Sequence, residues 1–288
     1  MNIKDEIYKR LPDINRVRTY HMDKYRKFLA NLLSNKNVEI IPLREFSKRP
    51  TEDKILLGIR HDVDHSLESA LRMAKIEAKL GIQTTYFILH TAPYYFKVQD
   101  GKIVRNESVI DILRTIQDEY GHEIGFHNDL LTLQIVYRIS PREYLRKELS
   151  YLRKNGIKIV GTAAHGSKYH DHYKYINYYF FKECEKPHPN FPNTDYVRIG
   201  DKKVIFEKGT LKEFDLEYEA YFLPYDYYFS DCQTVRGGKL WHPEMLDIKK
   251  IPLNSRIQIL IHPCRWYSYH ELITSIKKRI LHKINAER

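Results

Sequence analysis

Aspartate and histidine side chains recur in this sequence directly after short apolar runs. Asp62 and Asp64 follow a run that begins at Ile55. Later runs are followed by His90, His127, His165 and His262. Carboxylates and imidazoles bind zinc and related divalent ions, and a metal with three protein ligands keeps a position for a water whose pKa it lowers toward neutrality. These residue types therefore predict a hydrolytic metal site in which a second carboxylate acts as general base.

The apolar runs themselves are typical of buried strands, and helical periodicity fills the intervals between them. We expect strands over residues 55–60, 84–89, 123–126, 157–161 and 256–261. The intervening helices are predicted to end at Gly81, Gly121 and Gly156, because glycine adopts the left-handed conformation that follows a helix. Alternating strands and helices form parallel βαβ units, whose carboxyl ends meet on one rim. We therefore expect the aspartates and histidines at the five strand ends to lie together.

Three further segments complete the predicted architecture. Ser140-Pro141-Arg142-Glu143 is a capping box with proline at the first helical position, so a helix should begin there. Helices are also expected over residues 16–34 and, with a basic surface, over about 268–285. The Tyr-rich segment 173–230 shows few helical periods, and no secondary structure is predicted for it.

The composition excludes several classes of protein. The chain has 288 residues, of which 42% are hydrophobic and 30% charged, as in an ordinary globular protein. It contains neither an 18-residue apolar run nor an apolar segment near Met1, so we expect no membrane span, no secretory signal and a cytoplasmic location. Three widely spaced cysteines without a CxxC motif fit neither a disulfide framework nor a structural zinc site.

The net charge of +11 suggests an anionic partner at first sight. The basic excess lies mainly in residues 1–50 and 271–288 rather than in the central part of the chain. A nucleic-acid-binding protein more usually places basic residues beside aromatic platforms in its central fold. We therefore expect no nucleic-acid partner.

Three motifs together resemble the polysaccharide deacetylase family, carbohydrate esterase family 4. They are the sequences RHDVDH (60–65), GHEIGFH (121–127) and ILIHP (259–263). The first motif resembles the branch with Asp-x-Asp in place of adjacent aspartates. This resemblance, over residues 54–265, implies a single-domain α/β fold, a distorted (β/α) barrel. Residues 1–53 would form a helical, basic extension packed on the barrel, and residues 266–288 a basic C-terminal helix.

The resemblance also implies a role for each matching residue. Asp62 would be the general base, Asp64 and His127 metal ligands, and His262 the acid that protonates the leaving amine. Water would attack an N-acetyl carbonyl, with the metal polarising that carbonyl and holding the oxyanion. The cofactor would be a divalent metal, zinc in the first place, with cobalt or nickel as alternatives.

The sequence departs from the family pattern at two points. The second motif is usually His-x-x-x-His, but Leu131 stands four residues after His127. His165 is the expected third ligand, with Asp129 or no replacement as the alternatives. The Arg-x-Pro motif has no clear match, and Asp231 and Arg236 are expected to form a replacement substrate pocket. The further substrate-binding residues that we expect are Arg60 and Trp266.

The favoured function is a metal-dependent deacetylase that removes N-acetyl groups from an amino sugar or a cell-surface polysaccharide precursor of the O-antigen or capsule type. One alternative keeps the metal site and changes the substrate to another amide, such as a cyclic ureide. The other is a carbohydrate-binding protein that has lost catalysis. Retention of Asp62, Asp64, His127 and His262 favours an enzyme over an inert descendant. The oligomeric state is not predicted.

Overall fold

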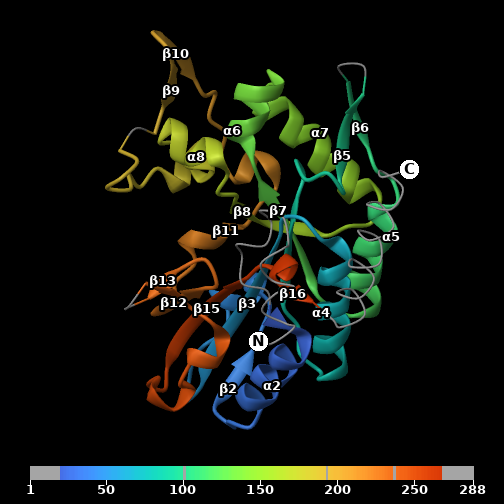
Figure 1. Ribbon diagram of the computed structural model, residues 1–288, viewed down its shortest axis with the longest axis vertical. Helices are drawn as coiled ribbons and strands as arrows, with labels where there is room; N and C mark the ends of the chain where they lie inside the picture. Colours follow the sequence, from blue (N-terminus) through green and yellow to red (C-terminus); the bar gives the residue numbers. More distant parts are fainter. Residues whose placement is uncertain (1–19, 100–101, 193, 236–237, 268–288) are drawn as a thin grey trace, which may run out of the picture.

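The central element of the fold is an eight-stranded parallel sheet (Figure 1). The computed structural model describes residues 20–99, 102–192, 194–235 and 238–267. Seven strands follow one path, in the order β11-β8-β7-β4-β3-β15-β12, and β2 pairs with the beginning of β3. The strands are β2 (Val38–Ile40), β3 (Ile55–Val63), β4 (Thr85–Leu89), β7 (Glu123–Asn128), β8 (Ile159–Ala164), β11 (Tyr218–Glu219), β12 (Tyr227–Ser230) and β15 (Ser255–Ile261).

The sheet is curled, so side chains from distant strands meet on its inner face. The rings of Phe87 in β4 and Tyr218 in β11 lie 6.5 Å apart, although β7 and β8 separate their strands. Gly125 and Gly161 make this approach possible, because a Cβ at Gly161 would stand 2.1 Å from Tyr218 and one at Gly125 would stand 2.4 Å from Phe87. The short helix α3 (Leu43–Phe46) adds apolar side chains to the same inner cluster.

The outer face of the sheet carries the larger part of the core. The main helices are α2 (Met22–Leu33), α4 (Leu67–Lys79), α5 (Val109–Arg114) and α7 (Pro141–Lys154). Figure 1 shows α4 and α5 on one side of the sheet. The predicted start of α7 is confirmed: Ser140 is the N-cap residue, and its hydroxyl accepts from the Glu143 backbone N–H at 3.4 Å. Gly81, Gly121 and Gly156 have φ of +73°, +76° and +85°, as predicted for residues that follow helices.

Smaller elements connect and cover this frame. They are β1 (Tyr20–His21), β5 (Phe96–Gln99), β6 (Lys102–Arg105), α6 (Leu130–Thr132), α8 (Lys168–Tyr173), β9 (Tyr196–Ile199), β10 (Lys202–Ile205), β13 (Thr234–Val235), β14 (Lys239–Leu240) and β16 (Trp266–Tyr267). Two π-helical turns cover Thr115–Glu119 and Leu133–Tyr137. Short 3-10 helices cover Asn177–Phe180, Lys182–Cys184, Lys212–Phe214, Ala220–Phe222, Pro243–Met245, Ile248–Lys250 and Pro263–Arg265. The β9–β10 hairpin stands at the top of Figure 1.

The predicted alternation of parallel strands and helices is confirmed. The sheet is curled but does not close into a full barrel. Within the described residues β11 and β12, the two ends of the strand order, do not pair with each other. Gln258 of β15 spans this opening by donating from Nε2 to the Ala220 carbonyl at 2.8 Å. None of the helices in the described ranges is long and apolar enough to cross a membrane.

The two ends of the chain differ in part from the predicted helices. The expected helix 16–34 is found as α2 from Met22 to Leu33. Tyr20 and His21 form β1 instead, and residues 16–19 lie outside the described ranges. Within residues 1–53, β2 joins the main sheet, and the boundary at residue 54 stays a prediction. The expected helix over 266–288 is wrong at its start, because Trp266 and Tyr267 form β16 and pair with β1. Its remaining part lies outside the described residues.

Candidate metal centre

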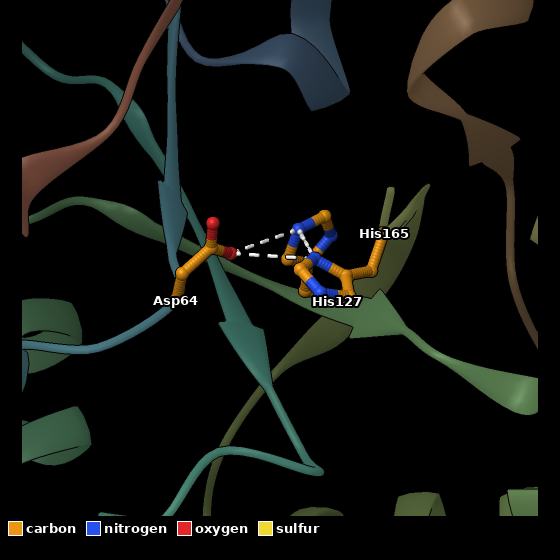
Figure 2. Close-up of side chains that lie close together, drawn as sticks. All are labelled: Asp64, His127 and His165. Atoms are coloured by element: carbon orange, nitrogen blue, oxygen red, sulfur yellow. Dashed lines mark hydrogen bonds and ion pairs between the residues drawn. The ribbon is translucent and has the colours of Figure 1, made fainter. Parts of the chain in front are cut away.

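Asp64, His127 and His165 bring three possible ligand atoms together at the carboxyl ends of the strands (Figure 2). Asp64 lies just beyond β3, His127 near the end of β7 and His165 just beyond β8. Asp64 Oδ1 is 3.4 Å from both His127 Nε2 and His165 Nδ1, and these two nitrogens are 3.2 Å apart. Three donors at the corners of a tetrahedron would lie about 3.3 Å apart for metal–ligand distances of about 2.0–2.1 Å. The triangle therefore fits a small divalent ion.

The hydrogen bonds around these residues fit the same interpretation. His127 Nδ1 lies 2.9 Å from the Ala163 carbonyl, which only accepts, so Nδ1 carries the proton. In the neutral ring, Nε2 then turns its lone pair toward Asp64 and His165. Asp64 Oδ1 is buried and accepts no hydrogen bond within the described structure. A bound cation would satisfy both groups, since each presents a lone pair to the same point.

Electrostatics favour the ionised form of the Asp64 carboxylate. Burial raises the pKa of Asp64, but the surrounding imidazoles of His127, His165 and His262 outweigh it, so its pKa lies well below the usual range. Burial lowers the pKa of His165, but Asp64 outweighs this effect and the pKa is raised. The site thus attracts a proton or another cation to the point between Asp64 and the two rings.

Asp62 lies beside the triangle and is held by Arg60. Both residues point to the inner face of β3 because side chains two apart share a face of a strand. Arg60 donates from Nε to Asp62 Oδ1 at 2.9 Å and from Nη2 to Oδ2 at 2.7 Å. Burial raises the pKa of Asp62, but the Arg60 charge, with His127 and His262, brings it below the ordinary value. Asp62 is therefore an ionised carboxylate, with Oδ2 3.5 Å from His127 Nε2.

His262, at the end of β15, faces the triangle from the other side. Its Nε2 is 3.7 Å from Asp64 Oδ2, and its Nδ1 is 2.6 Å from Asp231 Oδ1. The His262 backbone N–H also donates to Asp231 Oδ2 at 2.8 Å, which fixes the carboxylate against the ring. Burial lowers the pKa of His262, but Asp231, Cys232 and Asp64 outweigh it and raise the pKa well above the usual value. The raised pKa favours the imidazolium form of His262, which carries a proton on Nε2.

These groups line one cavity of about 660 Å³, which we call the site cavity. Its walls also include Tyr221, Tyr228, Cys232 and Arg265. Arg265 lies 2.9 Å from the Cys232 sulfur through Nη2, and it donates from Nη1 to the Asp231 carbonyl. The site cavity therefore combines a candidate metal position, an ionised carboxylate and a protonated imidazole within reach of one bound molecule.

Three of the residues expected to contact the substrate are buried. Arg60 and Asp231 are both 0% exposed, and each is bound to a neighbouring side chain of the site. Trp266 is 1% exposed and packs among Tyr20, Tyr25 and His242, so its ring is not available to a sugar. Arg236 lies outside the described residues.

His165, and not Asp129, lies in the group of possible ligand atoms with Asp64 and His127. Asp129 Oδ2 accepts from the Thr91 hydroxyl at 2.9 Å, and Oδ1 lies 3.5 Å from Asn177 Nδ2. Asp129 is not part of the group formed by Asp64, His127 and His165. Its carboxylate instead connects Thr91, in the loop after β4, with Asn177, at the start of a 3-10 helix.

Glu219 is a buried residue beside the site that the sequence did not identify. Its oxygens accept from the backbone N–H groups of Ala164 and Tyr221, at 2.8 and 2.7 Å. Burial raises its pKa to about 7, against the opposing charge of Arg60. Glu219 therefore joins the end of β8, which carries His165, to the wall formed by Tyr221. The one signal in the sequence was the position of Glu219 at the end of a short strand, and that strand lies in the Tyr-rich segment that shows few helical periods.

The comparisons with known proteins find a likeness among solved structures. No family model and no curated protein matches this chain. Among solved structures, the chain is similar to a family 4 carbohydrate esterase from Bacillus anthracis, with 14% identity and a TM-score of 0.35 over 88% of this chain and 86% of the other. At that identity and TM-score, the likeness carries no argument about the activity. The geometry of the site must carry it.

Proposed function

We propose that this protein is a metal-dependent deacetylase that hydrolyses the N-acetyl group of an amino sugar. The observation that carries the proposal is the convergence of Asp64, His127 and His165 beside an ionised Asp62 and a protonated His262 in one cavity. Two nitrogen donors and one carboxylate suit zinc, with cobalt and nickel as chemically similar alternatives. A divalent metal bound there would supply a Lewis acid for the acetyl carbonyl oxygen.

The protein's own residues supply the proton transfers of this reaction. Asp62 accepts a proton from the attacking water, whose oxygen adds to the acetamide carbon. His262 donates its Nε2 proton to the amide nitrogen as the C–N bond breaks, so acetate and a free amine are released. An amide nitrogen leaves poorly without a proton, and a raised imidazole pKa keeps that proton available at neutral pH.

Arg60 and Asp231 act as positioning residues in this scheme. Arg60 binds both oxygens of Asp62 and lies 4.4 Å from the centre of the Tyr221 ring, so the carboxylate has one fixed orientation. Asp231 orients His262 and stabilises its charged form. Both are buried, and both therefore keep an acid or base at a fixed distance from the metal position.

We further propose that the substrate is a precursor of a cell-surface polysaccharide and that the first motif places the protein in the Asp-x-Asp branch of the deacetylase family. Support comes from Asp62 and Asp64, which hold different positions in the site, one bound to Arg60 and one facing the two histidines. The tyrosine rings of the site cavity are suited to contact with a sugar.

The test compares acetate release and metal content in three variants. Asp62→Ala should retain metal and lose turnover, whereas Asp64→Ala should lose both. Asp111→Ala, which changes an exposed carboxylate on α5, is the matched control and should behave as wild type. Equal metal content in the Asp62 and Asp64 variants would contradict the assigned roles. Absence of acetate release from N-acetylated sugars by the metal-loaded wild type would overturn the proposed activity.

A further inference from the structure

A second cavity opens beside the site cavity. This outer cavity has a volume of about 720 Å³, within the range of small-molecule binding sites. It shares five lining residues with the site cavity: Ala164, His165, Gly166, His170 and Tyr221. A molecule held at the metal centre can therefore extend past His165 into the outer cavity without leaving the protein surface.

The walls of the outer cavity come from the Tyr-rich part of the chain. Tyr178 and Phe222 pack edge to face with ring centres 5.2 Å apart, and Tyr221 lies 6.1 Å from Tyr178. Phe222 is 39% exposed, which is unusual for so large an apolar side chain. Flat aromatic faces at a binding site are suited to the apolar faces of sugar rings. This arrangement provides a platform for a second sugar residue.

The polar groups of the outer cavity are cationic or neutral. They include Lys186, His170 and His188, and none of the described residues that line this cavity is an aspartate or a glutamate. Lys186 is exposed and forms no ion pair within the described ranges. The site cavity, by contrast, contains Asp62, Asp64 and Asp171. Among the described lining residues, the outer cavity therefore has no carboxylate to repel an anionic group, whereas the site cavity has three.

We propose that the outer cavity binds a sugar residue that carries a carboxylate or phosphate group and is linked to the acetylated residue at the metal centre. The substrate is then an anionic glycan of at least two residues. This inference rests on the proposed deacetylase function for the identity of the neighbouring residue. The aromatic walls bind the ring, and Lys186 interacts with the anionic substituent.

Binding can be measured separately from hydrolysis. Calorimetric titrations of the full chain would be made with EDTA present, so that no probe is consumed. The probes are a heparosan tetrasaccharide for carboxylate, N,N′-diacetylchitobiose 6′-phosphate for phosphate, and N,N′-diacetylchitobiose and tetra-N-acetylchitotetraose as neutral counterparts. At low salt, at least one anionic probe should bind about tenfold more tightly than its neutral counterpart. The difference should shrink as salt is added.

Two variants and their controls test the residues involved. Lys186→Ala should remove the preference for the anionic probe, whereas Lys182→Ala, an exposed lysine in the same segment, should keep it. Phe222→Ala should weaken neutral and anionic probes alike by about threefold. Ile205→Ala, which removes a 71% exposed side chain from the β9–β10 hairpin, should change neither.

The results separate this inference from the proposed function. Equal affinity for anionic and neutral probes, no binding of any probe, or equal effects of Lys186→Ala and Lys182→Ala would overturn the inference. Acetate release from neutral oligomers would still support the deacetylase in that case. A preference for anionic probes without acetate release from any of them would overturn the deacetylase and retain the anion-binding cavity.

Discussion

Asp231→Asn should shift the alkaline limb of the activity profile to lower pH. The Asp231 carboxylate is fully buried and accepts from His262 Nδ1 at 2.6 Å. Its charge helps to raise the pKa of His262 well above the usual value, although burial opposes it. His262 is therefore protonated and able to act as an acid below that raised pKa, and activity is lost as the pH rises through it. The contribution of protonated His262 to folding stability is fully present below about pH 6.5 and is lost as the pH rises through the raised pKa.

The size of the shift follows from the strength of the bond that is weakened. A hydrogen bond to a charged group contributes about 1.5–3 kcal/mol, and one pKa unit corresponds to about 1.36 kcal/mol. Asparagine keeps an acceptor oxygen but loses the charge, so the pKa of His262 should fall by about 1–2 units.

Two measurements on this variant check the reasoning. One is kcat/KM for acetate release as a function of pH, and the other is an NMR titration of the His262 ring, assigned by its loss in His262→Gln. Asp111→Asn, on the exposed face of α5, is the matched control. A well-folded Asp231→Asn protein with an unchanged alkaline limb and an unchanged His262 titration would refute the role of Asp231.

Three further predictions concern stability. Burial raises the pKa of Glu77, but His61, His122 and Tyr25 outweigh it and lower the pKa to about 2. The contribution of ionised Glu77 to folding stability is therefore present above the ordinary carboxyl pKa and is lost as the pH falls through about 2. Glu77→Ala should cost about 3–5 kcal/mol in urea unfolding, and a cost near zero would show that the charge is not held as described. Gly161→Ala should cost about 1–3 kcal/mol in the same assay, since its Cβ would stand 2.1 Å from the Tyr218 ring; wild-type stability would contradict this close approach. For Glu219, whose pKa burial raises to about 7, stability is fully present below the ordinary carboxyl value and is lost as the pH rises through about 7. Glu219→Gln should therefore reduce the loss of unfolding free energy between about pH 5 and 8 by up to about 3 kcal/mol, and identical pH profiles would argue against an uncharged Glu219.

Strand periodicity made much of the site predictable from sequence. His165 could be expected near His127 because neighbouring parallel strands end on the same side of a sheet. The register confirms why: His127 pairs with Ala163, so His165 lies two residues further along, on the same face of the curled sheet. His262 follows β15, which pairs with β3 as far as His61, so its place near Asp64 follows from the same rule.

The functions of Arg60 and Trp266 could not be assigned in this way. Arg60 was expected at the rim, but β3 continues to Val63, so its side chain lies within the curl and reaches Asp62 on the same face. The two-residue spacing was the available signal for this pairing. Trp266 is buried because β16 pairs with β1, and no local pattern indicates a contact between such distant parts of the chain.

The secondary structure of the Tyr-rich segment could not be predicted, because its buried residues do not recur at a regular spacing. Tyr175 and Tyr179 are buried in a smaller cluster, to which 3-10 turns and the β9–β10 hairpin contribute together with Leu131 of α6 and Ala164 of β8. Neither the helical nor the strand period applies to such turns. The outer cavity, most of whose lining residues come from this segment, could therefore not be predicted from sequence periodicity.

The metal content of the purified protein decides whether Asp64, His127 and His165 form a metal site. Wild type, His165→Ala and Asp129→Asn would be incubated with zinc, freed of excess metal and analysed for bound zinc. We predict one zinc per chain in wild type and Asp129→Asn, because Asp129 lies outside the ligand group, and a clear loss in His165→Ala. Wild type that binds no zinc, cobalt or nickel, or His165→Ala that retains a full equivalent, would contradict the assignment of Asp64, His127 and His165 as the metal ligands.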